Sequence, residues 1–271
     1  ADWFMLAGEV PSPWLHTAAS NYASIYYRIA AGAYTSQYDV GAFTLAIKQS
    51  DGVLFRENWV SAPLEFLDHD GNVVPVKSFD ELNVASCLSN ETGLLSRRDR
   101  VQSQEPVGGN TYTASRGNGV WFVDAPSATN WYANKMYLIL INPLHTGADK
   151  LLTFVGKVRN APAHTVGAIV QSDGVLPHEN WVGYPYPVLT SFDQGAVASV
   201  LTDQSGLLGN RDKVQSQEPV GGDTFTASRG VGTWFHDSPT ATNLVAGKGY
   251  LIWINPLHTG ATTNWIVPKP Y

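Results

Sequence analysis

Residues 101–122 read VQSQEPVGGNTYTASRGNGVWF, and residues 214–235 read VQSQEPVGGDTFTASRGVGTWF. The two stretches begin 113 residues apart, and the same spacing links Ser78 with Ser191 and Ile141 with Ile254. Solenoid and propeller repeats have periods of about 20–50 residues, whereas this period is the size of a small domain. The sequence therefore predicts a tandem duplication of one domain.

The matching segments also define the limits of the two copies. SDGVLFRENWV begins at Ser50 and SDGVLPHENWV at Ser172, 122 residues apart, which leaves nine extra residues in the first copy. Asp70, Gly71 and Asn72 read as a tight hairpin turn within that insertion. We expect a first module at 1–150, with insertions near 18–43 and 61–77, and a second at 151–271. The chain should pass from one to the other between 147 and 160.

Within each copy, short apolar runs alternate with turn residues. GYLIWINP is a continuous apolar run typical of a buried strand, and DTFTASR alternates as a half-buried strand does. The Gly pairs at 108–109 and 221–222 mark hairpin turns that need positive φ angles. Repeated short strands at this spacing favour an antiparallel sandwich or barrel. We expect an all-β protein of two tandem antiparallel β-sandwich modules.

Composition and charge exclude several classes of function. The net charge is −6 and no basic patch stands out, so a nucleic-acid partner is not expected. No apolar run approaches the ~18 residues of a membrane helix, so no membrane span is expected. The polar residues are mostly Ser, Thr, Asn and Gln, and the chain starts at Ala1. These features favour an extracellular or cell-surface protein whose signal peptide has been removed.

Residues with catalytic or metal-binding chemistry are present, but not in a pattern that predicts a site. Cys87 has an apolar counterpart, Val200, so we expect a small buried residue. The histidines lack the short spacing of metal ligands, and the Asp68–Asn72 stretch reads as a hairpin instead of a calcium loop. Carboxylates recur in both copies, but nothing in the sequence shows that two of them converge across a cleft, as glycoside hydrolysis requires. No nucleophile elbow is present. We expect no enzyme, and no catalytic, metal or cofactor-binding residue.

The second copy contains an ordered set of aromatic, turn and core residues: Trp181, Gly183, Pro185, Pro187, Asp212, Val214, Gly232, Trp234, Gly247, Gly249 and Tyr250. This order resembles a repeat module of uncharacterised secreted or surface β proteins of Verrucomicrobia, Planctomycetes and some Proteobacteria. The resemblance covers most of each copy but is weaker in the first, where Pro63 stands in place of Pro185 and ANKMYLILIN replaces AGKGYLIWIN. It implies a secreted β module and no particular activity.

Two functions of different classes remain. The first is a structural, self-associating extracellular protein, such as a subunit of a filament, sheath or surface layer, whose partners are copies of itself. The alternative is a secreted module that binds cell-surface glycans through exposed tryptophans, since flat aromatic faces suit sugar rings. The competing interpretation of the paired tryptophans is that they fill the core. Four tryptophans outside the paired set are the better candidates for contacts between modules or subunits: Trp3, Trp14, Trp131 and Trp265.

Self-association has two candidate sources in the sequence. The repeated hairpin keeps its polar residues, which suggests a repeated partner surface on the neighbouring module or subunit; recent duplication is the other explanation. A strand-like motif also occurs three times, as WFMLAGEV, LLTFVGKV and NWIVPKPY. Its terminal copies could add strands across subunits and form an open head-to-tail polymer, or could complete their own sheets. The candidate self-association residues are Trp3, Phe4, Gln102, Gln104, Glu105, Arg116, Gln215, Gln217, Glu218, Arg229, Trp265 and Ile266.

Overall fold

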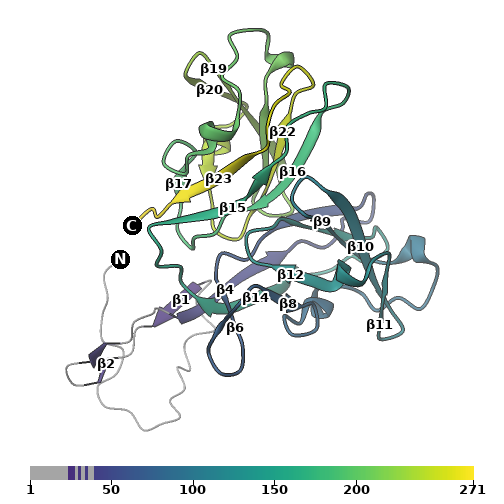
Figure 1. The fold of residues 1–271 in the computed structure, drawn as a ribbon. Helices are drawn as coiled ribbons and strands as arrows, with labels where there is room; N and C mark the ends of the chain where they lie inside the picture. The colour runs from purple at the N-terminus through teal and green to yellow at the C-terminus, as the bar shows by residue number, and fades with distance from the viewer. Residues whose placement is uncertain (1–23, 28–29, 32–33, 36–39) are drawn as a thin grey trace.

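The computed structural model describes residues 24–27, 30–31, 34–35 and 40–271, and within them the chain forms β-strands and short 3-10 helices only. Figure 1 shows two similar halves that follow one another along the chain. This confirms the all-β fold of two tandem sandwich modules. Among these described residues, no helix has the length and apolar character needed to cross a membrane.

The first half is built around a five-stranded antiparallel sheet. Its order is β11-β10-β9-β13-β5. The strands are β5 (Arg56–Val60), β9 (Arg100–Glu105), β10 (Asn110–Gly117), β11 (Val120–Val123) and β13 (Tyr137–Ile141). A second sheet contains β1 (Ser24–Tyr27), β4 (Val40–Ile47) and β14 (Lys150–Lys157) in the order β1-β4-β14. Apolar residues from both sheets, including Ile47, Val101 and Phe154, form one buried core.

The second half repeats this arrangement. Its five-stranded sheet has the order β16-β22-β18-β19-β20. Read from the opposite edge, the sheet of the first half has the same order of equivalent strands, β5-β13-β9-β10-β11. The strands are β16 (His178–Gly183), β18 (Lys213–Glu218), β19 (Asp223–Gly230), β20 (Thr233–His236) and β22 (Gly249–Ile254). The second sheet pairs β15 (Ala163–Ile169) with β23 (Thr263–Pro268). A separate core includes Ile169, Val214 and Trp265.

Short elements complete each half. The small strands are β2 (Ala30–Ala31), β3 (Tyr34–Thr35), β6 (Phe66–Leu67), β7 (Val73–Val74), β8 (Val76–Ser78), β12 (Asn130–Tyr132), β17 (Thr190–Ser191) and β21 (Asn243–Leu244). The 3-10 helices are η2 (Val84–Cys87), η3 (Leu95–Arg97), η4 (Pro126–Thr129), η5 (Val197–Val200), η6 (Leu208–Asn210) and η7 (Pro239–Thr242). The nine-residue insertion of the first half forms the β6–β7 hairpin, which turns at Gly71 with a φ of 83°.

Strand pairing shows where one half ends. β14 pairs with β4 along its whole length, from Lys150 opposite Ile47 to Lys157 opposite Val40. Residues 150–157 therefore complete the first half, and the chain enters the second half after Lys157. This point lies within the expected stretch 147–160, but seven residues past the expected boundary at 150/151. We use "first half" for the described residues up to 157 and "second half" for 158–271.

Candidate functional site

The repeated hairpins lie between the two halves. Residues 106–109 join β9 to β10, and residues 219–222 join β18 to β19. Val107 of the first half packs into the core of the second half, and Val220 of the second half packs into the core of the first. Each half thus supplies a side chain that completes the other half's core.

Glycines allow the hairpin tips to fit into the opposite half. Gly108 and Gly221 have φ angles of 71° and 73°, in the left-handed region that favours glycine. A Cβ atom at Gly108 would lie 2.6 Å from Asn180 Oδ1, and one at Gly221 would lie 2.5 Å from Asn58 Oδ1. Only glycine therefore suits these positions, because the tip both turns sharply and touches the facing half.

Gln104 and Gln217 make equivalent hydrogen bonds between the halves. The Trp181 backbone N–H donates to Gln104 Oε1 at 2.9 Å, and the Gln104 Nε2 group donates to the Glu179 carbonyl at 3.1 Å. Gln217 repeats this pattern with Trp59 at 2.9 Å and Glu57 at 3.1 Å. Each Oε1 also accepts the N–H of its own tip glycine at 2.9 Å. The two glutamines therefore satisfy backbone groups in the buried region between the halves.

An apolar seam lies beside the two glutamines. It contains Trp59, Met136, Leu138, Trp181 and Leu251, all less than 10% exposed. Backbone hydrogen bonds flank it: Ser61 N–H donates to the Gly247 carbonyl at 2.8 Å, and Gly183 N–H to the Asn134 carbonyl at 2.6 Å. These two bonds join equivalent positions of the two copies. The interface therefore has the isologous form of a two-fold dimer, contained in one chain.

The other candidate residues of the hairpins make contacts within their own half. Gln102 and Gln215 donate to the threonine hydroxyls of Thr113 and Thr226 at 3.2 Å. The charged residues form ion pairs in equivalent places: Glu105 with Lys135, Glu218 with Lys248, Arg116 with Asp80, and Arg229 with Asp193. Of the eight hairpin candidates, Gln104 and Gln217 are therefore the ones whose side-chain hydrogen bonds cross between the halves.

The terminal candidates need correction where the structure describes them. Trp3 and Phe4 lie outside the described residues, as does Trp14. Trp265 is 1% exposed in the core of its own half, where its Nε1 donates to the Gly195 carbonyl at 2.9 Å. The β23 strand that carries it completes its own sheet by pairing with β15. Trp265 is therefore not available to fill a pocket of another subunit. Ile266 points outward and is 49% exposed.

Of the described tryptophans, Trp59, Trp131, Trp181 and Trp265 are buried, whereas Trp121, Trp234 and Trp253 are partly exposed. Trp131 is 0% exposed and stacks on Tyr137 with ring centroids 4.0 Å apart, so it does not serve contacts between modules. Trp121 and Trp234 are partly buried against Phe79 and Phe192. The four buried tryptophans therefore pack in cores or in the seam between the halves, and Trp234 lines an open groove of the second half.

Two buried carboxylates, which sequence reasoning did not assign to a role, organise loops. The Asp99 side chain accepts the backbone N–H groups of Ser89 at 2.6 Å and Asn142 at 2.7 Å, and lies 2.7 Å from His145 Nδ1. Asp212 makes equivalent contacts with the backbones of Thr202 and Asn255 and with His258 Nδ1. The signal was present in the sequence, because this Asp and the Asn-Pro-Leu-His-Thr-Gly motif recur in both copies. Their geometry stabilises the loops around each sheet.

Cys87 lies in the core of the first half, where it is 0% exposed. Burial raises the pKa of its thiol, so the reactive thiolate form is disfavoured. Its Sγ lies 3.5 Å from the Leu151 carbonyl oxygen, which is the hydrogen-bond acceptor. The residue therefore packs as a small core side chain. This agrees with the alignment of the two copies, in which Val200 occupies the equivalent position of the second half.

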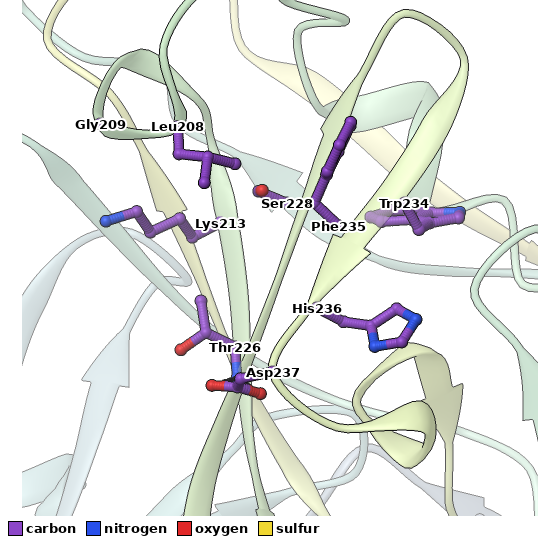
Figure 2. Close-up of a pocket in the computed structure, with 9 residues that line it drawn as sticks. All are labelled: Leu208, Gly209, Lys213, Thr226, Ser228, Trp234, Phe235, His236 and Asp237. Carbon is purple, nitrogen blue, oxygen red and sulfur yellow. Dashed lines mark hydrogen bonds between the residues drawn. The ribbon is translucent and has the colours of Figure 1, made fainter.

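The outer face of each five-stranded sheet carries an open groove. The groove of the second half has a volume of about 640 Å³, and Figure 2 shows the nine residues that line it: Leu208, Gly209, Lys213, Thr226, Ser228, Trp234, Phe235, His236 and Asp237. The groove of the first half, about 480 Å³, is lined at equivalent positions by Leu95, Arg100, Thr113, Ser115, Phe122, Val123 and Asp124. Both grooves thus combine an aromatic ring, hydroxyls, a cation and a carboxylate.

Buried arginines support the aromatic rings of the two grooves. The Arg98 guanidinium carbon lies 3.9 Å from the centroid of the Phe122 ring, and that of Arg211 lies 4.1 Å from the Phe235 ring. Both arginines are 6% exposed. Stacking of a guanidinium on an aromatic face is favourable and holds the ring in place. The phenylalanines of both grooves therefore make the same contact with a buried arginine.

Among the described residues, no group of three or more His, Cys, Asp or Glu side chains is arranged to hold a metal ion. Comparison of the chain with protein-family models, with curated proteins and with solved structures found no match.

Proposed function

We propose that the chain is a structural, self-associating component of an extracellular assembly such as a filament, sheath or surface layer. The observation that carries the proposal is the equivalent placement of outward-facing apolar residues in both halves of an internally symmetric unit. A unit that exposes the same surface at two places can bind two neighbours, and such contacts propagate an assembly.

The exposed apolar residues occur in matched pairs. Leu95 and Leu208 are 59% and 57% exposed, Phe122 and Phe235 are 40% and 41% exposed, and in each half the leucine and the phenylalanine line the same groove. Contiguous apolar surface is uncommon on monomeric soluble proteins and usually marks a site of interaction. Its recurrence in both halves supports an association role at each end of the molecule.

The character of the polar residues supports the proposed location. Charged residues make up 15% of the chain, below the usual quarter, and most polar side chains are uncharged. In both halves a buried aspartate, Asp99 or Asp212, contacts a histidine ring and the backbone of neighbouring loops, which stabilises the loops without a disulfide. These features fit a component of an extracellular assembly.

Sedimentation velocity over a hundredfold range of protein concentration tests the proposal. We expect the average mass to rise with concentration, and electron microscopy of the most concentrated sample should show ordered assemblies. A single monomeric species over the whole range, with no assemblies on the grid, would rule the proposal out.

The paired grooves favour glycan binding as the second candidate function. Each groove places an exposed phenylalanine beside threonine and serine hydroxyls and a cation, which suits the apolar face and hydroxyls of a sugar ring. Binding of a glycan to the monomeric protein, lost in a double Phe122→Ala and Phe235→Ala variant, would support this function. Unchanged binding in that variant would place the glycan elsewhere.

A further inference from the structure

Among the residues that the structure describes, the outermost strands β11 and β20 have one edge without a strand partner. Each is the terminal strand of a five-stranded sheet, where β11 pairs with β10 and β20 pairs with β19. In the described part of the chain, no backbone hydrogen bond joins either strand to a further strand. The opposite ends of the sheets, β5 and β16, face the interface between the halves, where Val60 bridges to Lys248 and Val182 to Lys135.

Apart from their short length of four residues, these two edges lack the features that usually prevent sheet edges from pairing. Proteins protect free edges with charged side chains, prolines or bulges. β11 reads Val-Trp-Phe-Val and β20 reads Thr-Trp-Phe-His, without proline or a carboxylate or ammonium group. Both pair with their inner neighbours in unbroken register. Val120, Phe122 and Val123 are 52%, 40% and 44% exposed, so the edge is both regular and apolar.

The two edges suit one another. Because they carry the same central Trp-Phe pair, antiparallel pairing of one edge with another brings aromatic and β-branched side chains opposite each other. Neither edge places like charges opposite one another, since neither strand contains Lys, Arg, Asp or Glu. Arg98 and Arg211 already hold Phe122 and Phe235 in fixed positions, which reduces the entropy lost on association. A second copy of this chain is therefore the occupant that the edges favour.

The two edges cannot pair with each other inside one molecule. In Figure 1, β20 lies at the upper left of the second half and β11 at the lower right of the first half, at opposite ends of the molecule. Pairing must therefore join different copies. Because each copy offers an edge at both ends, successive pairing extends a row of sheets instead of stopping at a dimer.

We propose that β11 and β20 are the self-association sites of this chain, where edge-to-edge antiparallel pairing joins neighbouring copies into an open row. This inference rests on the proposed structural function and assigns it to two defined strands. It replaces the chain termini as the expected point of contact, because β23 already completes the sheet of its own half.

A double Val120→Lys and Thr233→Lys variant tests the inference by placing one charged side chain on each edge. Both positions are exposed, so the variant should fold, which far-ultraviolet circular dichroism and the midpoint of thermal unfolding can verify. We expect sedimentation velocity to show monomers at concentrations where the unaltered chain associates. The matched control is Leu54→Lys with Leu176→Lys, which adds the same charge at exposed loop positions and should associate as the unaltered chain does.

The single variants sharpen the test. Val120→Lys alone leaves one free edge per molecule, so no species larger than a dimer should form, and the same holds for Thr233→Lys alone. Association of the double variant at the level of the unaltered chain would overturn the inference while leaving the structural function intact. Growth of a single variant beyond dimers would also overturn it. A strictly monomeric unaltered chain would overturn the inference and the proposed function together.

Discussion

Gln104 and Gln217 show how a single side chain can join two domains. Each is about 5% exposed or less, and each binds backbone groups of its own hairpin tip and of the facing strand. A backbone N–H group that is buried without a partner costs free energy comparable to a lost hydrogen bond. Each hairpin tip packs against the facing half and so buries these backbone N–H groups away from water. The glutamines are therefore needed as their hydrogen-bond acceptors.

Gln217→Ala should lower the free energy of unfolding by about 1–3 kcal/mol, because the buried N–H groups of Trp59 and Gly221 lose their acceptor. The matched control is Gln215→Ala, since that side chain donates its hydrogen bond to the Thr226 hydroxyl of its own sheet at 3.2 Å. Urea unfolding of both variants measures the difference. Equal destabilisation by the two substitutions would show that the hydrogen bonds between Gln217 and the first half add no stability beyond that of a hydrogen bond within one sheet.

His164 gives the structure a pH dependence. It lies in β15 with its Nδ1 atom 3.2 Å from Nη1 of Arg159. Burial and the neighbouring Arg159 charge lower the pKa of His164 from 6.5 to about 4. The unfolded chain therefore binds a proton that the folded chain does not bind between these values. The free energy of unfolding should fall as the pH is lowered from about 6.5 to about 4.

Replacing His164 with Gln removes this titration, so the variant should lose less stability over the same pH interval. Urea unfolding at several pH values measures the slope for both proteins. A variant whose stability falls as steeply as that of the unaltered chain would mean that other groups cause the acid sensitivity.

At the scale of elements, the hairpin tips depend on glycine for two separable reasons. Gly108 and Gly221 have positive φ angles and also lie against the facing half. Gly119 and Gly232, in the neighbouring hairpins, have φ angles of 77° and 72°, but nothing lies within 4 Å of a Cβ atom placed there. The two pairs therefore separate the strain of the backbone from the clash of the added carbon.

Gly221→Ala should cost roughly 3 kcal/mol or more, since the Cβ atom would meet Asn58 and Lys48 and force the halves apart. Gly232→Ala should cost only about 1 kcal/mol, the strain of a left-handed residue with a side chain. Thermal or urea unfolding compares the two variants. Similar losses at both positions would contradict the close contact between the tip and the facing half.

The hairpins could be predicted from the sequence, but their partners could not. The Gly pairs and the alternation of DTFTASR indicated two strands and a tight turn, because turn chemistry and strand periodicity are local properties. Val107 fills the core of the second half because of the way the two folded halves pack together. A local sequence pattern cannot predict that packing. The position of Trp265 was misjudged for the same reason: a terminal strand that pairs with β15 looks in sequence like a free one.

At the scale of the whole molecule, the exchanged valines couple the two halves. Val107 and Val220 each complete a core formed mainly by the other half, and the Trp59–Trp181 seam is buried between them. Removing one half would therefore expose apolar surface of the other. The molecule should behave as one cooperative unit although it consists of two similar modules.

We expect calorimetry to show a single unfolding transition whose van't Hoff and calorimetric enthalpies agree. Val220→Ala should shift that transition to lower temperature without splitting it, because the cavity it leaves in the first half weakens both halves together. Two separate transitions, in the unaltered chain or in the variant, would show that the halves unfold independently.

The duplication predicted the general form of the molecule, since two similar sequences of this length fold into similar sheets. The internal two-fold interface and the free edges of β11 and β20 follow from the strand order, which depends on contacts between distant residues. Antiparallel partners within each sheet, such as Tyr137 opposite Val60, are far apart in the chain. Such pairings are set by the packing of the complete core and are not encoded in any one segment.

Hydrogen exchange measured by mass spectrometry as a function of protein concentration tests the central claim most directly, because it reports on the backbone N–H groups of the free edges. We predict that peptides covering Val120–Val123 and Thr233–His236 gain protection at the concentrations where the mass increases, while the loop at Val53 and Leu54 continues to exchange rapidly. Assembly without added protection at either strand would contradict edge-to-edge pairing as the way in which copies of this chain associate.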